Sequence, residues 1–250
     1  MFTRAAAKVA GWGDRVQVAI GDFGHPESLG KAAAGVKGIF LMNGGDGEQF
    51  KNLLTAVKEQ GRPRIVFLST ILAGPEELLI GRMHREKEDV IRRSGLEGRF
   101  LRPGAFMSNV LQWAGSIRAE GTVFNALGEG KFAPAAPEDI AAVAVEALLR
   151  YTDEVLELTG GELTTAPEQV TVLSEVLGKP IQCVDVPMET AVQGLLRAGL
   201  PEFIARAVAK SFEAIRHGKS DQTTDTVERV TGRKPIRFAD WARSHAGRFA

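Results

Sequence analysis

The sequence predicts an α/β protein with a mostly parallel sheet that helices cover on both faces. Short, nearly continuous apolar runs alternate with longer amphipathic segments through the first two thirds of the chain. Strands buried on both faces require such runs, and intervening helices favour parallel pairing with right-handed connections. The length of 250 residues suits one large domain, or one domain with a small appended lobe.

Four strands are predicted because each is an apolar run that ends at small or polar residues or at proline. They cover 16–20, 38–42, 64–68 and 98–102. Helices are predicted between them. One includes Phe50, from which apolar residues recur with helical spacing, and can end at Gly61. Another spans about 76–94 and stops at Gly95, and a third begins at Pro137.

The pattern changes after Tyr151 and divides the chain in two. Residues 1–150 are predicted to form the ligand-binding domain, and 151–250 a small, helix-rich substrate-binding or lid lobe packed closely on it. Strands in this lobe are expected at 155–158 and 181–186. A capping-box pattern at 165–168 predicts a helix start, and further helices are expected at about 188–198, 201–217, 221–231 and 238–249.

Composition excludes several classes of protein. The 31 basic and 31 acidic side chains cancel, which argues against a protein that mainly neutralises nucleic-acid phosphates. No apolar run is long enough for a membrane helix, and Cys183 alone cannot form an intrachain disulfide. The four histidines lack metal-ligand spacing, so no metal site is predicted. We expect a soluble, cytoplasmic protein without a membrane or nucleic-acid partner; a homodimer remains open.

Ligands of an open parallel sheet collect at the carboxyl ends of its strands. Here those ends are rich in glycine and polar residues: 21–23, 43–45, 69–70 and 103–106. Glycine lets a ligand approach the backbone closely. From spacing alone, ordinary transitions from strand to loop explain these residues equally well.

A longer motif resembles a known family. The helical run 82–96 continues into RFLRPGAFMSN at 99–109, which is similar to the lysine helix and "SGL…LRPG.FM.N" segment of NmrA-like proteins. The segments GDF…PESL at 21–29, PEDIA at 137–141 and FADWA at 238–242 fit the same family. NmrA-like proteins are atypical short-chain dehydrogenases that bind NAD(P). The resemblance covers essentially the whole chain and implies a Rossmann-like domain, a nicotinamide dinucleotide and a small-molecule acceptor.

The resemblance implies roles for single residues at the adenosine end of the cofactor. Asp22 and Phe23 would lie beside the adenine. Arg4 occupies the position after the second strand where the family often has an arginine. Its guanidinium suits a 2′-phosphate, which favours NADP over NAD.

At the nicotinamide end the resemblance implies a larger set of residues. Lys87 would bind the nicotinamide ribose and is the candidate catalytic residue, although a solvated helix face is an alternative explanation for it. The ribose and nicotinamide path would be lined by Leu41, Met42 and Asn43, with Ser69 and Thr70 beneath the nicotinamide and Pro103, Gly104 and Phe106 flanking it. Phe106 and Asn109 would face the substrate.

One departure from the family pattern concerns proton transfer. Met83 stands four residues before Lys87, where members that transfer protons carry a tyrosine, and methionine cannot donate a proton. His84 is the nearest alternative acid. Two functions therefore stay open: an NAD(P)H-dependent oxidoreductase acting on a quinone-like or small carbonyl acceptor, or a non-catalytic nucleotide-redox sensor or regulatory binding protein.

The other departure concerns the pyrophosphate. Residues 1–4 match the end of the family's second strand, so the first βα unit, with its glycine-rich loop, is expected to be missing. A misassigned start or a truncated form unable to bind the cofactor is the third hypothesis. The glycines at 44–47 are interpreted as a helix-capping loop. We expect that residues 1–4 form no normal interior strand, and that 16–20 pairs with 39–42 or another chain fills the gap.

Overall fold

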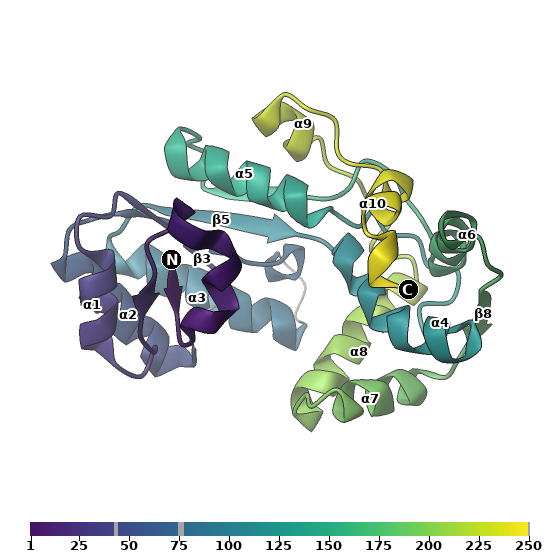
Figure 1. Ribbon diagram of the computed structural model, residues 1–250. Coiled ribbons are helices and arrows are strands. Elements are labelled where there is room, and N and C mark those ends of the chain that lie inside the picture. The colour runs from purple at the N-terminus through teal and green to yellow at the C-terminus, as the bar shows by residue number, and fades with distance from the viewer. Residues whose placement is uncertain (43–44, 75–77, 250) are drawn as a thin grey trace.

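The computed structural model describes residues 1–42, 45–74 and 78–249 (Figure 1). Within them the strands form three parallel sheets. The largest has the order β3-β4-β5-β7, and the other two pair β1 with β2 and β6 with β8. The strands are β1 (Phe2–Thr3), β2 (Ala19–Ile20), β3 (Gly38–Leu41), β4 (Arg64–Leu68), β5 (Gly98–Pro103), β6 (Thr122–Asn125), β7 (Val155–Leu158) and β8 (Gln182–Asp185).

The two central strands of the four-stranded sheet, β4 and β5, bury side chains on both faces, whereas Phe40 of β3 is 36% exposed. Phe67 and Phe100, which pair in register across β4 and β5, face a core built with α1 (Pro26–Ala33), α2 (Gly47–Glu59) and α3 (Leu79–Ser94). Val66 and Leu101 face the opposite core, built with α5 (Pro137–Leu149) and α9 (Thr226–Thr231). Figure 1 shows α5 and α9 on one side of β5 and α1–α3 on the other.

Helix ends follow the predicted capping signals. The Asp46 side chain accepts hydrogen bonds from the first turn of α2 and forms a capping box with Gln49, so the helix-capping interpretation is confirmed for residues 45–47. Gly44 lies outside the described residues. Thr165 and Glu168 form the predicted capping box of α6 (Ala166–Leu177). Gly95 ends α3 in the left-handed conformation, with φ 74°.

Of the two alternatives expected for the gap, the pairing of 16–20 with 39–42 is wrong, and its filling by another chain stays a prediction. β2 covers only Ala19–Ile20 and pairs with β1, while β3 pairs with β4. The preceding residues form a 3₁₀ segment, η1 (Ala6–Arg15), with a kink at Gly13. Met1 and Thr3 carbonyls accept hydrogen bonds from the backbone around β2, which satisfies those groups without β3. β1 thus lies in a separate two-stranded sheet and, as expected, is no interior strand of the large one.

The chain passes between its two lobes more than once. β6 lies before residue 150 and pairs with β8, whereas β7 lies after it and completes the four-stranded sheet. A further core, separate from the two that flank the large sheet, packs around Phe238 and Trp241. The remaining elements are η2 (Ile71–Ala73), η3 (Met107–Trp113), α4 (Ala114–Glu120), α7 (Met188–Arg197), α8 (Glu202–Arg216), α10 (Phe238–Ser244) and η4 (Ala246–Arg248). No helix in the described ranges could cross a membrane.

Candidate active site

The carboxyl ends of three adjacent strands bring the predicted residues to one edge of the large sheet. Leu41 pairs with Phe67, and the pairing of β4 with β5 continues beyond the strands, where the Ser69 amide donates to the Leu101 carbonyl at 2.7 Å. The Gly104 amide likewise donates to Leu158 at 3.0 Å. The ends of β3, β4 and β5 therefore lie side by side, as parallel pairing requires.

Ser69 belongs to a buried polar network below this edge. Its hydroxyl donates to Glu88 Oε1 at 2.5 Å. Arg102 donates to the same carboxylate from Nε at 2.9 Å and from Nη2 at 2.7 Å. The Glu88 side chain has no exposed surface, and its hydrogen bond raises the pKa of Arg102. The Ser69 hydroxyl is thus bonded to α3.

No motif in the sequence predicts this network. Ser69 and Arg102 continue the strand faces of Phe67 and Phe100, because side chains alternate along a strand. Glu88 lies on the face of α3 that also carries Gly81 and is buried against the sheet. The available signal was a glutamate within the inward stripe of an amphipathic helix.

The loop after β4 is fixed to α3. The Thr70 hydroxyl accepts the Leu72 amide at 3.3 Å and caps η2. Arg85 Nε donates to the Ala73 carbonyl at 2.9 Å. A Cβ at Gly81 would lie 1.9 Å from the Leu72 carbonyl oxygen, so glycine alone allows this approach of helix and loop.

Lys87 reaches the start of α2. Its Nζ donates to the Gly45 carbonyl at 3.1 Å and lies 5.4 Å from the centre of the Phe50 ring. Burial lowers the pKa of Lys87, and the nearby Asp46 carboxylate opposes that effect. The amine therefore lies beside the residues that follow β3. Met83 is 36% exposed.

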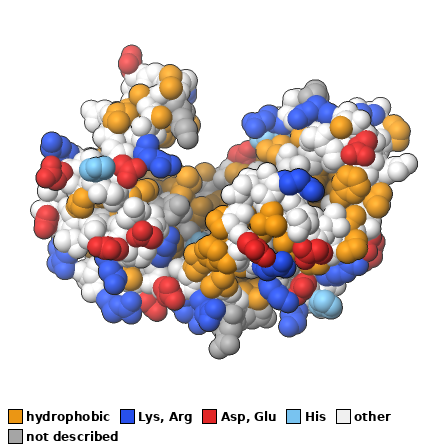
Figure 2. Space-filling model, turned by 90° about the horizontal axis from the view of Figure 1, so that it is seen from below, with side chains coloured by type: hydrophobic (Ala, Val, Ile, Leu, Met, Phe, Trp, Pro, Cys, Tyr) orange, Lys and Arg blue, Asp and Glu red, His pale blue; other side chains and the backbone are white. Residues whose placement is uncertain are grey.

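Among the other residues predicted at this end, Leu41 is buried and Met42 is exposed. Pro103 is buried, and Phe106 is half-buried and bridges Ala135. Asn109 is exposed on η3. Asn43 lies outside the described residues. Leu41 and Pro103 end β3 and β5, and Met42 directly follows β3. Figure 2 shows that the molecule is hollowed between two rounded parts.

A separate group of predicted residues lies at the end of the two-stranded sheet. Arg4 is 79% exposed along its side chain, and its Nε lies 3.9 Å from Asp22 Oδ2. Asp22 also accepts the Gly24 amide at 2.8 Å, and the Phe23 ring packs 5.7 Å from that of Phe2. A cavity of about 290 Å³ opens here; its lining is Arg4, Ile20, Gly21, Asp22, His25 and Ser28.

The side chains present suit an anionic dinucleotide at both ends. An exposed guanidinium borders a cavity at Arg4, and the ammonium of Lys87 lies by the strand ends. Both are donors of the kind that bind phosphate or sugar oxygens. In the described ranges, no group of three or more histidine, cysteine or acidic side chains could hold a metal ion.

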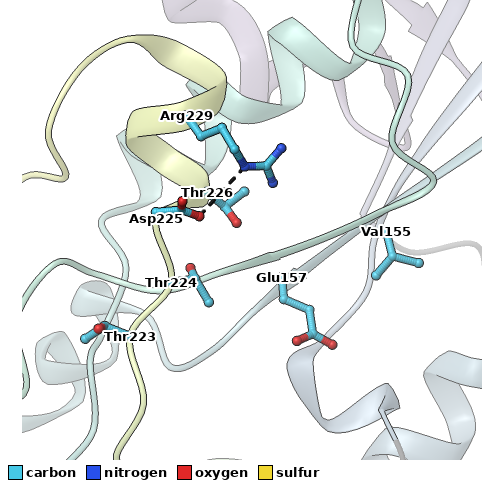
Figure 3. A pocket seen from close by; sticks show the side chains of 7 residues that line it. All are labelled: Val155, Glu157, Thr223, Thr224, Asp225, Thr226 and Arg229. Carbon is cyan, nitrogen blue, oxygen red and sulfur yellow. Dashed lines mark ion pairs between the residues drawn. The ribbon is translucent and has the colours of Figure 1, made fainter.

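A larger open pocket of about 760 Å³ lies elsewhere, on the outer side of β7 (Figure 3). Val155 and Glu157 line it from the strand, and residues 223–226 with Arg229 line it from the start of α9. Arg229 Nε lies 3.7 Å from Asp225 Oδ1. No predicted site residue borders this pocket, so its size alone does not make it the ligand site.

Comparisons with known proteins agree with the motif. Residues 1–150 match the model of a family described as NAD(P)H-binding. An NAD(P)H azoreductase of Xenophilus azovorans is 34% identical over 255 aligned positions, which cover 99% of this chain and 89% of that protein. A (4-alkanoyl-5-oxo-2,5-dihydrofuran-3-yl)methyl phosphate reductase of Streptomyces griseus is 35% identical, covering 95% and 86%.

A solved structure of similar fold is the NADPH-dependent quinone oxidoreductase of Escherichia coli. It is 25% identical with a TM-score of 0.79, and the alignment covers 98% of this chain and 88% of that one. The α/β fold predicted from the strands, and the Rossmann-like form that the family resemblance implies, are thereby confirmed. With its family match, its relatives and its NmrA-like motif, the chain belongs to the NAD(P)H-binding family of atypical short-chain dehydrogenases.

Proposed function

We propose that this chain is an NAD(P)H-dependent oxidoreductase that reduces a quinone-like acceptor. The observation that carries this proposal is the placement of Lys87 and His84 on α3, beside the carboxyl ends of β3 and β4. Relatives that reduce azo compounds and quinones support the same reaction class. When bound, the reduced nicotinamide supplies a hydride.

The residues of the chain divide the work of binding between two regions. Arg4 takes the 2′-phosphate, so NADPH is preferred to NADH, and Asp22 and Phe23 lie beside the adenine. Lys87 binds the nicotinamide ribose, and the hydrogen bond from its amine to the Gly45 carbonyl orients it.

The rest of the nicotinamide site is largely apolar. Leu41 and Met42 line the path, and Pro103, Gly104 and Phe106 flank the ring. Thr70 and Ser69 form the floor, with Ser69 held by Glu88. Such a site excludes water from the reacting faces, and Phe106 and Asn109 face the acceptor.

A non-catalytic redox sensor is the second candidate. Tyr151, the sole tyrosine of the chain, accepts a hydrogen bond from Arg229 near β7 and is remote from α3 in sequence. Position 83 carries methionine, so the reductase lacks a tyrosine there. A quinone does not require that acid, because its reduced oxygen can take a proton from another donor.

Calorimetry with NADPH, followed by reduction of 1,4-benzoquinone and methyl red, tests the proposal. Lys87→Met is expected to weaken NADPH binding by about tenfold or more, the worth of one hydrogen bond to a charged group, ~1.5–3 kcal/mol. Lys58→Met is the matched control, because Lys58 Nζ donates to Ser94 at the far end of α2. NADPH binding without turnover would favour the sensor, and no NADPH binding would refute both functions.

A further inference from the structure

His84 lies on the sheet-facing side of α3. Gly81, Glu88 and Ile91 are the buried residues of this helix, and position 84 falls among them at helical spacing. The centre of its ring is 6.1 Å from that of Phe67, two residues before Ser69. The imidazole therefore borders the carboxyl end of β4, where the nicotinamide ring and its acceptor are expected to meet.

The hydrogen bond of the ring determines its tautomer. Nδ1 lies 2.9 Å from the Ile80 carbonyl oxygen, which can only accept, so Nδ1 carries a proton in the neutral ring. Among the described residues Nε2 has no hydrogen-bond partner. Nε2 is thus an acceptor when the ring is neutral and a donor when it is imidazolium.

The surroundings make the imidazolium a stronger acid than an exposed one. Burial lowers the pKa of His84, the bond to Ile80 opposes this, the Lys87 ammonium lowers it further and the Glu88 carboxylate opposes it. Phe67, the ring neighbour from β4, is uncharged. At the start of α2, the Asp46 carboxylate raises the pKa of Lys87 by its charge.

We propose that His84 Nε2 donates the proton that completes reduction of a quinone-type acceptor. The inference rests on the proposed function. The acceptor gains a hydride at one carbonyl oxygen, which forms the first O–H bond. An electron pair of the ring moves to the other carbonyl oxygen, which becomes a phenolate. The Nε2–H bond then breaks, its electron pair stays on nitrogen, and the proton forms the second O–H bond of the hydroquinone. The Nδ1–H group keeps its hydrogen bond to the Ile80 carbonyl oxygen. Nε2 then takes up a new proton from water.

Steady-state reduction of 1,4-benzoquinone by NADPH tests the step in wild-type, His84→Gln and His217→Gln proteins. His217 is a matched control, because its Nδ1 lies 2.7 Å from the carbonyl four residues earlier and it is exposed at the end of α8. His84→Gln should lower kcat by about 10²-fold or more, while the KM for NADPH stays within about twofold. His217→Gln should match the wild type.

The pH profile is a second readout. The wild-type kcat should fall as pH rises through the pKa of His84, since imidazolium is lost, and this limb should be absent in His84→Gln. An unchanged kcat and pH limb in His84→Gln would overturn the proposal.

Nitrogen-15 histidine NMR of the wild-type protein provides a readout without turnover. We expect His84 to show the Nδ1–H tautomer and a pKa below the ordinary value of a histidine. An Nε2–H tautomer would overturn the inference even if the enzyme is active. If calorimetry detects NADPH binding and the wild type reduces the quinone, failure at His84 leaves the proposed function standing. If the wild type binds NADPH but reduces no acceptor, both fall.

Discussion

The two ends of the candidate site are built in different ways. At the large sheet, Glu88 is fully buried and bonded to Ser69 and Arg102 at 2.5–2.9 Å. At the two-stranded sheet, Arg4 and Asp22 are exposed and make a single contact of 3.9 Å. Buried hydrogen-bonded charges are costly to disrupt, whereas exposed ion pairs contribute little to stability. Removal of the buried charge at the first end should therefore affect folding, and removal of the exposed charge at the second should affect ligand binding alone.

The largest effect is expected from Glu88→Ala. It leaves the Arg102 guanidinium, 12% exposed, without its bidentate partner and frees the Ser69 hydroxyl. Removing one member of a buried ion pair costs about 3–5 kcal/mol. Urea unfolding should show that loss in the free energy of unfolding. Glu189→Ala removes an exposed partner of Arg206 and should change nothing measurable. Equal stabilities of the two variants would contradict the comparison.

Gly81→Ala is expected to have the next largest effect. The new Cβ would meet the Leu72 carbonyl oxygen at 1.9 Å, so α3 or the loop after β4 must move. Such overpacking costs about 1–3 kcal/mol. The control is Gly194→Ala in α7, where no atom lies within 4 Å of the added carbon; better helix propensity should stabilise it by up to about 1 kcal/mol. Thermal unfolding should give a lower Tm for Gly81→Ala and a higher Tm for Gly194→Ala. A similar fall in Tm in both variants would argue against the close contact of Gly81 with Leu72.

The same contrast explains which parts of the fold the sequence predicts. β4 is a nearly continuous apolar run, whereas β5 holds the apolar pair Phe100–Leu101 between two arginines. Both strands bury side chains on both faces and lie where the pattern places them. β6, with the sequence TVFN, is a short run without such a pattern, and its pairing with β8 depends on residues far away in the chain. The segment 16–20 has an apolar pattern, yet only Ala19–Ile20 pairs, and Ile20 is 56% exposed.

Like the fold, the candidate site is predictable from the sequence only where local patterns encode it. Lys87 and the strand ends follow from a motif and from the rule that ligands bind at carboxyl ends. The bonds of Glu88 to Ser69 and Arg102 join three elements, so no local spacing encodes them. Sequence predicts which residues approach an edge, whereas the pairing of buried charges across that edge depends on tertiary packing.

The smallest effect on stability is expected from Arg4→Ala. The side chain is 79% exposed and its contact with Asp22 is at the limit of an ion pair, so the free energy of unfolding should change by less than about 0.5 kcal/mol. Binding should respond much more, because a guanidinium that is not committed to the fold is available to a phosphate.

Loss of the contact between Arg4 and the 2′-phosphate should raise the Kd for NADPH about tenfold or more. The Kd for NADH should stay nearly unchanged, since only NADPH carries a 2′-phosphate. Calorimetry with both nucleotides measures the ratio of the Kd for NADH to the Kd for NADPH. Arg15→Ala, on η1, removes another arginine of the same region, whose Nε donates to the Trp12 carbonyl, and should leave the ratio unchanged. A ratio that falls equally in both variants would assign the preference to general positive charge, and Arg4 would lose its specific role.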